Sequence, residues 1–358
     1  MFTLQKFIAA LLFIFIFFIP GVVFGQIENP DGELKKASSD EIWAQTMQGR
    51  NFNEFWSYHF YLNDSLKVHA TFSVANFGRF KAPVSGLRLT VLNLDDNVLY
   101  QVSREYPLDI LIQNKSSYTF KMHPDREVYF KGKLPDEHEV RINTSKNGVT
   151  YDIHLTFENI ANGYRWDQGK FNIGNEEIGI ITHIPYAEVK GYVSVNEHKK
   201  KVKGTAYMDH TFQNQTISRL MHSGYRFIYH EDADNWDILY FLYPSARDNK
   251  TIGYRLTNRN NCIKLQGTQE IKDITRSRSF QNTLAQDIEL ELDNKKTIKL
   301  SRSSDEEMFS VFEELGWVQR RAARAFLGGE VLDFRGEAIL TEPNKKPKKG
   351  NYNFFKVD

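Results

Sequence analysis

The chain has 358 residues, and its 46 basic and 45 acidic side chains leave a formal charge of only +1. This balance leaves no broad basic surface, so we expect no nucleic-acid partner. The single cysteine, Cys262, excludes an intramolecular disulfide framework. A chain of this length must therefore be held together by its hydrophobic core.

The N-terminus has the layout of a secretory signal peptide. Lys6 precedes an apolar run over residues 7–19, and small residues follow at 23–25. We predict that residues 1–25 are removed and that Gln26 becomes the N-terminus. An uncleaved membrane anchor is the alternative, because the run is only slightly shorter than the roughly 20 residues that span a bilayer. The sequence thus predicts an exported protein, periplasmic or secreted.

Most of the remaining chain alternates apolar and polar side chains, which predicts strands. Residues 68–74 alternate in this way, and residues 149–157 do so directly after Asn147-Gly148, a strong hairpin signal. Residues 288–292 alternate with acids before another turn. Short strands with regular turns and no interleaved helices favour antiparallel barrels or sandwiches.

The predicted fold class is therefore all-β, with two lipocalin-like antiparallel barrels or sandwiches in tandem. We expect an N-terminal linker at residues 26–48, a first domain at 49–215 and a second domain at 216–342. One amphipathic helix near the C-terminus interrupts this pattern.

That helix is predicted over residues 304–327. Ser304 and Glu307 have the spacing of a capping box, and apolar side chains then recur every three or four residues. Gly328 ends the segment, and a strand with one apolar face follows it at once.

Basic residues cluster twice near the C-terminus. Arg320, Arg321 and Arg324 lie on the predicted helix, and we interpret them as its solvated face rather than as an anion site. Four lysines at residues 345–349 predict that residues 343–358 form a disordered basic tail.

The densest group of chemically active side chains lies within residues 204–213. Side chains alternate along a strand, so Tyr207 and Asp209 share one face while His210 points to the other. If the Asp209 face lines a barrel lumen, it is a site; if it lies at a domain seam, it is a structural hydrogen-bond cluster. In either case we expect Asp209 to be buried and hydrogen-bonded near the strand of Trp56.

This Tyr-x-Asp-His strand, which follows a basic hairpin at residues 197–203, resembles the AttH-like and carotenoid 1,2-hydratase family. The early aromatic strand at residues 55–59 and the aromatic stretch at 225–240 also fit that family. The resemblance implies two calycin-type barrels with the Asp209 strand near their junction. Hydratases of the family add water to an isolated double bond of a long polyene, and some relatives are isomerases or cyclases. The family pattern has Asn and Trp-Gly after the Asp-His pair, where this chain has Thr211-Phe212-Gln213-Asn214.

The resemblance also implies roles for individual residues. Asp209 would be the acid that protonates the double bond, with Tyr207 or His210 holding the acid or the water. Aromatic rings would shield the resulting cation. The candidate ligand-binding residues are Trp56, His59, Gln213, Tyr225, Trp236 and Tyr240.

We predict no metal and no cofactor. His210, His222 and His230 are separated by gaps that match no compact zinc pattern, even with Asp209 added. The sequence has neither a Gly-rich phosphate loop nor a Gly-x-Ser-x-Gly nucleophile motif.

Three functions stay open at this point. The first is an exported lipocalin-like protein that binds a hydrophobic small molecule, a lipid or an isoprenoid. The second is a hydro-lyase (hydratase) or isomerase that acts on an apolar substrate through Asp209. The third is a structural envelope protein whose barrels are filled with side chains. Peripheral contact with a membrane and the oligomeric state are left undecided by the sequence.

Overall fold

The computed structural model describes residues 27–28, 32–47, 49, 51–78, 81–95, 98–244, 248–310, 312 and 316–358. The predicted signal peptide and its cleavage site lie outside these residues. Among the described residues, no helix combines the length and the apolar character that a membrane crossing requires.

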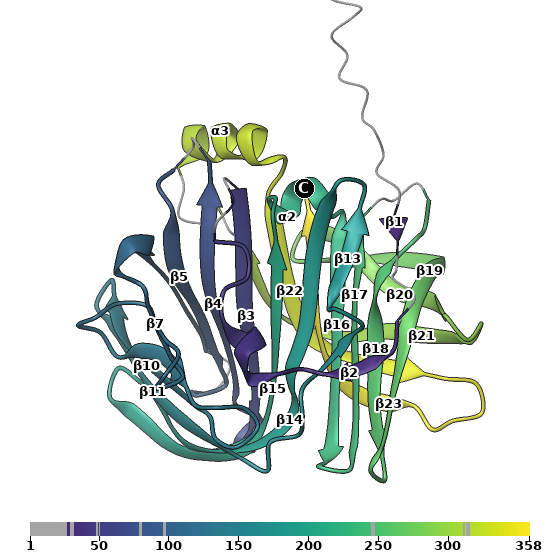
Figure 1. The fold of residues 1–358 in the computed structure, drawn as a ribbon, viewed down its shortest axis with the longest axis horizontal. Coiled ribbons are helices and arrows are strands. Elements are labelled where there is room, and N and C mark those ends of the chain that lie inside the picture. The colour runs from purple at the N-terminus through teal and green to yellow at the C-terminus, as the bar shows by residue number, and fades with distance from the viewer. Residues whose placement is uncertain are drawn as a thin grey trace, which may run out of the picture.

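A curled sheet of 15 strands forms the first unit (Figure 1). Its main path runs β6-β5-β4-β3-β15-β14-β11-β10-β9-β8-β7, so the late strand β15 pairs with the early strand β3. The strands are β1 (Ile27–Glu28), β2 (Leu34–Lys36), β3 (Asn51–Leu62), β4 (Lys67–Phe77), β5 (Val84–Leu92), β6 (Leu99–Pro107), β7 (Ile112–Asn114), β8 (Thr119–Lys121), β9 (Val128–Lys131), β10 (Glu139–Lys146), β11 (Val149–Glu158), β12 (Tyr164–Trp166), β13 (Lys170–Ile173), β14 (Glu176–Val195) and β15 (His198–Gln213).

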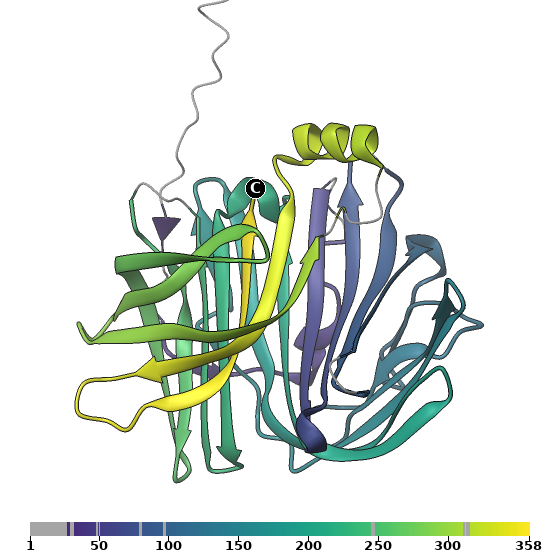
Figure 2. The ribbon, with the colours of Figure 1, turned by 180° about the vertical axis from the view of Figure 1, so that it is seen from behind.

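A closed barrel of eight strands forms the second unit. In Figure 2 its C-terminal strands, in yellow, cross the back of the molecule. The strands are β16 (Ser223–Asp232), β17 (Asn235–Tyr243), β18 (Ile252–Arg259), β19 (Cys262–Ser279), β20 (Asn282–Leu292), β21 (Thr297–Ser310), β22 (Val331–Thr341) and β23 (Lys348–Val357). The helices are α2 (Ile217–Leu220) and α3 (Trp317–Leu327), and short 3-10 turns occur at η1 (Ser39–Ile42), η2 (Asn63–Ser65) and η3 (Leu108–Ile110).

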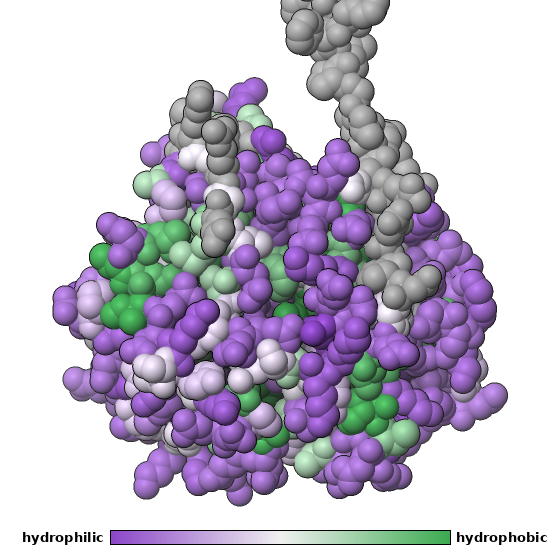
Figure 3. Space-filling model, in the orientation of Figure 1, coloured by the Kyte–Doolittle hydropathy of each residue, from purple (hydrophilic) through white to green (hydrophobic). Residues whose placement is uncertain are grey.

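Three large hydrophobic clusters hold these units. The concave interior of the curled sheet is packed with aromatic and aliphatic side chains, Trp56 and Phe130 among them. The barrel lumen is filled in the same way, with Phe227 and Phe241 fully buried in it. A third cluster joins the outer face of β16–β18 to β14 and β15, and we call this contact between the two units the seam. Figure 3 shows a mainly hydrophilic surface with separate hydrophobic patches. The expected all-β tandem fold is confirmed.

The predicted start of the long helix is wrong. Residues 304–310 belong to strand β21, and α3 begins only at Trp317. The pairing of β21 with β22 shifts register between Arg302 and Ser304 and again between Asp305 and Glu307. Such bulges add a residue to one strand and break the period of two, so the spacing imitates a helix. The C-terminal end of the helix was predicted correctly, because Gly328 follows Leu327 with a left-handed φ of 90°.

The predicted disordered tail is also wrong. Lys348–Val357 forms β23, which pairs with both β22 and β16 and so closes the barrel. Two lysines of the basic run have acidic partners on other strands, because Lys348 pairs with Asp237 of β17 and Lys349 lies 2.9 Å from Glu337 of β22. Ion pairs therefore hold this end of the basic run in the folded barrel.

Candidate functional site

Strand β15 separates two buried environments. His210 lies opposite Trp56 of β3 and shares the interior of the curled sheet with Met208, whereas Tyr207 and Asp209 face the barrel. This is the arrangement that strand alternation predicts. The Asp209 face therefore lies at a domain seam and not in a lumen.

At the seam, Asp209 is bound by an arginine of the barrel. Arg226 of β16 donates from Nε to Oδ2 at 2.7 Å and from Nη2 to Oδ1 at 3.0 Å, and Asp209 is fully buried. Arg226 Nη2 also donates to the Tyr240 hydroxyl at 3.0 Å, and that hydroxyl lies 2.9 Å from Thr211 Oγ1. Burial lowers the pKa of Arg226, but the neighbouring carboxylate outweighs burial and raises it overall. A carboxylate held by a permanent cation on both oxygens suits a structural role.

The same network continues along the outer face of the barrel. Arg226 donates to Asn353 Oδ1 at 2.9 Å, and Asn353 in turn donates to Asp333. Arg335 binds Asp333 and Glu307, each at 2.9 Å.

Side chains of the curled sheet complete this network. Arg88 of β5 donates to Asp333 at 2.8 Å, and Thr90 donates to Glu307 at 2.7 Å. Glu307 is fully buried, so its charge depends on these donors. Three arginines and three carboxylates thus connect the two units through buried ion pairs.

The other predicted site residues do not form one site. His59 lies in the seam, its ring 4.9 Å from that of His69 and 5.8 Å from that of Tyr207. Burial, with smaller effects from His69 and nearby arginines, holds the pKa of His59 well below its usual value. Trp236 also packs in the seam, and Gln213 is buried farther along β15.

Tyr225 belongs to a third environment. Its ring stacks on Phe354 at 4.4 Å and on Phe241 at 5.0 Å, inside the barrel lumen. Within the described ranges, no three His, Cys, Asp or Glu side chains are grouped so that they could hold a metal ion.

Inside the curled sheet, His210 forms a pair that the sequence analysis missed. His210 Nε2 lies 3.0 Å from Glu54 Oε2, and both side chains are fully buried. The His210 ring stacks on Trp56 at 4.4 Å with an interplanar angle of 16°. Glu54 lies on the same face of β3 as the buried residues Phe52 and Trp56. An acidic residue on this apolar face is the sequence signal that could have revealed the pair.

The segment before β3 covers this pair. The backbone N–H groups of Gln45 and Thr46 donate to Glu54, and Trp56 Nε1 donates to the Ile42 carbonyl at 2.8 Å. Burial raises the pKa of Glu54, but His210 and these backbone donors together hold it below its usual value. Glu54 is therefore a carboxylate at neutral pH.

A second polar pair lies in the same aromatic interior. The Tyr58 hydroxyl and His138 Nε2 are 2.9 Å apart, and burial lowers the pKa of His138 to about 3. The ring of Phe130 lies 5.9 Å from the ring of His138 and 6.1 Å from that of Trp56. The two pairs thus share one aromatic cluster.

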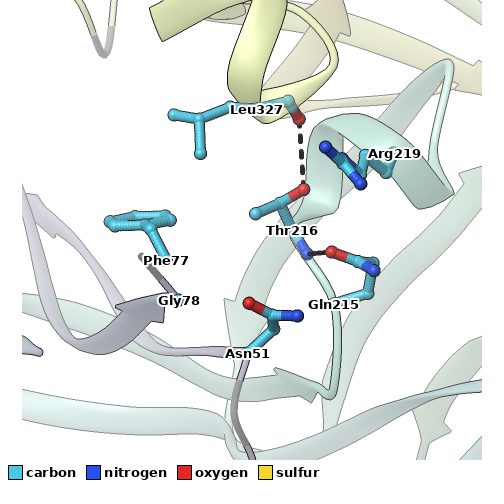
Figure 4. A pocket seen from close by; sticks show the side chains of 7 residues that line it. All are labelled: Asn51, Phe77, Gly78, Gln215, Thr216, Arg219 and Leu327. Carbon is cyan, nitrogen blue, oxygen red and sulfur yellow. Dashed lines mark hydrogen bonds between the residues drawn. The ribbon is translucent and has the colours of Figure 1, made fainter. Parts of the chain in front are cut away.

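Away from both pairs, a cavity of about 210 Å³ opens near the ends of β3 and β4, beside α2 and α3 (Figure 4). Thr216 Oγ1 donates to the Leu327 carbonyl at 3.1 Å and closes one side. The lining residues are Asn51, Phe77, Gly78, Gln215, Thr216, Arg219 and Leu327. None of the predicted site residues belongs to this lining.

The curled sheet and the closed barrel define a tandem lipocalin-like protein, and solved structures share this fold. A protein of Nitrosomonas europaea that is assigned as an AttH matches with a TM-score of 0.61 at 11% identity, covering 91% of this chain and 98% of its own. Kievitone hydratase from Nectria haematococca matches with a TM-score of 0.53 at 14% identity, covering 93% and 98%. No protein-family model and no curated protein matches the chain. The expected resemblance to AttH-like hydratases is confirmed at the level of the fold.

Proposed function

We propose that the chain is a hydratase-type enzyme, a hydro-lyase, which adds water to a carbon–carbon double bond of an apolar substrate. The observation that carries this proposal is the buried His210–Glu54 pair, stacked against Trp56 in an aromatic interior. The fold shared with kievitone hydratase supports the reaction class by analogy. His210 takes the role of the acid in place of Asp209, because Arg226 binds both oxygens of Asp209 as an ion pair. In His210 only Nε2 is held by a charged group, Glu54, whereas Nδ1 lies 3.3 Å from the Glu41 carbonyl and is the nitrogen that would turn to a substrate.

In this proposal, protonated His210 donates its proton to the less substituted carbon of the double bond. The carbocation forms at the other carbon, where the face of Trp56 shields it. Water adds to that carbon and returns one proton to His210, so the net change is the addition of one water. Glu54 orients the imidazole ring and stabilises its charged form throughout. The segment at residues 41–46 keeps bulk water away from the pair.

Replacing His210 by Gln, or Glu54 by Gln, is expected to lower turnover at least ~100-fold, because the first variant removes the acid and the second removes the carboxylate that orients it. The probes are a panel of isoprenoid alcohols, prenylated phenols and lycopene, and mass spectrometry detects the gain of one water. His230→Gln is the control, because His230 is a half-buried histidine of the seam, hydrogen-bonded to Thr205 and Pro185. A wild-type chain without activity on the whole panel, or an active His210→Gln variant, would contradict the proposal.

Binding and transport of a hydrophobic molecule is the second candidate function. The cavity beside Phe77 and Leu327 is the observation that favours it, since apolar side chains line part of a volume of about 210 Å³. The barrel lumen offers less support, because its own aromatic side chains fill it. Mass spectrometry of organic extracts from the purified protein distinguishes the two functions, because a carrier retains its ligand and an enzyme releases its product.

Export belongs to the same proposal. Removal of residues 1–25 should leave Gln26 at the N-terminus, since small residues precede it. N-terminal sequencing of protein from the cell envelope tests this expectation. Material that still begins at Met1 would mean that the apolar run is retained as an anchor.

A further inference from the structure

Helix α3 lies across one end of the molecule, above the ends of β4 and β5 (Figure 1). Its sequence contains three arginines and no acidic residue. Its residues Ala323 and Leu327 are buried and pack with Phe312. The helix therefore has one short apolar face turned toward the protein.

Two of its three arginines are held at the base of the helix. Arg320 Nε donates to Glu330 at 2.9 Å and Arg324 Nε donates to the same carboxylate at 2.6 Å, while Glu330 is fully buried. Asp358 lies 3.8 Å from Arg324. Arg321 is exposed and has no ion-pair partner among the residues that the structure describes.

The outer face of α3 carries an exposed tryptophan among polar and small side chains. Trp317 is 75% exposed, whereas the other four tryptophans are all buried. Arg321 lies one turn after Trp317 on the same side, and Ala325 lies one turn farther. Ala322 and Ala325 are exposed. This face thus presents one large aromatic ring, small apolar side chains and Arg321, a cation that has no ion-pair partner among the described residues, to solvent.

We propose that α3 docks the protein on a membrane surface that carries anionic headgroups. Tryptophan prefers the membrane–water interface, and an arginine beside it would contact the headgroup phosphates. A helix of 11 residues is about 16 Å long, too small to supply the roughly 800 Å² per partner of a stable protein interface. Shallow insertion of a single aromatic side chain fits this small area better than a second copy of the chain.

The cavity beside α3 supports the same orientation. Leu327 is the last residue of the helix and also part of the cavity lining. An apolar molecule that leaves a bilayer beneath α3 would therefore meet this cavity first. The docking surface is independent of the His210–Glu54 pair, so either proposal can fail alone.

The test uses the chain from Gln26 onward, which includes every described residue and leaves out the apolar N-terminal run. Binding is measured by co-sedimentation with phosphatidylcholine vesicles, with and without phosphatidylglycerol, and by quenching of tryptophan fluorescence with brominated lipids. We expect binding and quenching only with the anionic vesicles. Trp317→Ser is expected to weaken binding at least about tenfold. Arg321→Glu should weaken it as well, whereas Phe280→Ser, which removes a 40% exposed ring elsewhere, should leave binding unchanged.

Four results of the binding and size measurements would overturn the proposal, and one result of the quenching measurement. The four are no co-sedimentation, equal binding to neutral vesicles, full binding by Trp317→Ser, and a dimer in size-exclusion chromatography that Trp317→Ser dissolves. The last result would assign the face to a second copy of the chain. Brominated-lipid quenching that persists in Trp317→Ser would place a different tryptophan in the bilayer and would equally refute docking through α3.

Discussion

Replacing Asp209 by Asn is expected to lower the free energy of unfolding by about 3–5 kcal/mol, because it leaves the buried guanidinium of Arg226 without its carboxylate. Denaturant unfolding measures this loss. In the double variant Asp209→Asn with Arg226→Met, part of the stability should return, since no unpaired charge remains. Asp167→Asn is the matched control, because it breaks a largely exposed ion pair with Lys35 and should cost less than about 1 kcal/mol.

The same variant decides between the two roles that the sequence leaves open for Asp209. If the seam role holds, folded Asp209→Asn retains its hydration activity. An Asp209→Asn variant with wild-type stability and no activity would instead make Asp209 the acid and would remove His210 from that role.

Acidification from pH 7 to pH 5 is expected to destabilise the protein strongly. Burial is the main cause that lowers the pKa of five histidines: His59, His69 and His183 fall well below the usual value, His138 to about 3 and His230 to about 4. In the unfolded chain each histidine takes up a proton near pH 6.5, whereas in the folded protein it stays neutral. Unfolding therefore binds protons, and the stability present above pH 6.5 is lost as the pH falls toward 4.

Each such histidine contributes at most about 1.4 kcal/mol per pH unit in this window. Thermal and denaturant unfolding at several pH values measure the slope. His138→Gln should reduce the slope of the unfolding free energy against pH by about 1.4 kcal/mol per pH unit, the effect of one proton, even if the variant is less stable at every pH. His198→Gln, which changes an exposed histidine, serves as the control. A stability that is flat between pH 7 and pH 5 would contradict the prediction.

Alternation along β15 was sufficient to predict that Asp209 and His210 face opposite ways, because a strand has a fixed period of two. The same reasoning failed at β21, where two bulges break that period. It also failed for β23, since local charge indicated a tail while the partners that neutralise it lie on β17 and β22. The local sequence pattern predicts a strand or helix only where no bulge breaks its period and no distant ion-pair partner changes its environment.

The partners of the site residues could not be predicted in this way. His210 and Glu54 are 156 residues apart in the sequence and meet because β15 pairs with β3. Arg226 reaches Asp209 only because the outer wall of the barrel packs on β15. The first contact depends on the register between β15 and β3, and the second depends on how the barrel packs on β15. Neither can be read from a single sequence. The resemblance to AttH-like proteins indicated the junction but not the residues across it.

The closure of the barrel by β23 has a consequence for synthesis on the ribosome. The first strand of the barrel, β16, pairs with this last strand, so the ring stays open until residues 348–357 have emerged. Until then β16 and β22 each present an unpaired edge, and such edges readily pair with other chains. A chain that ends before Lys348 should therefore depend on chaperones.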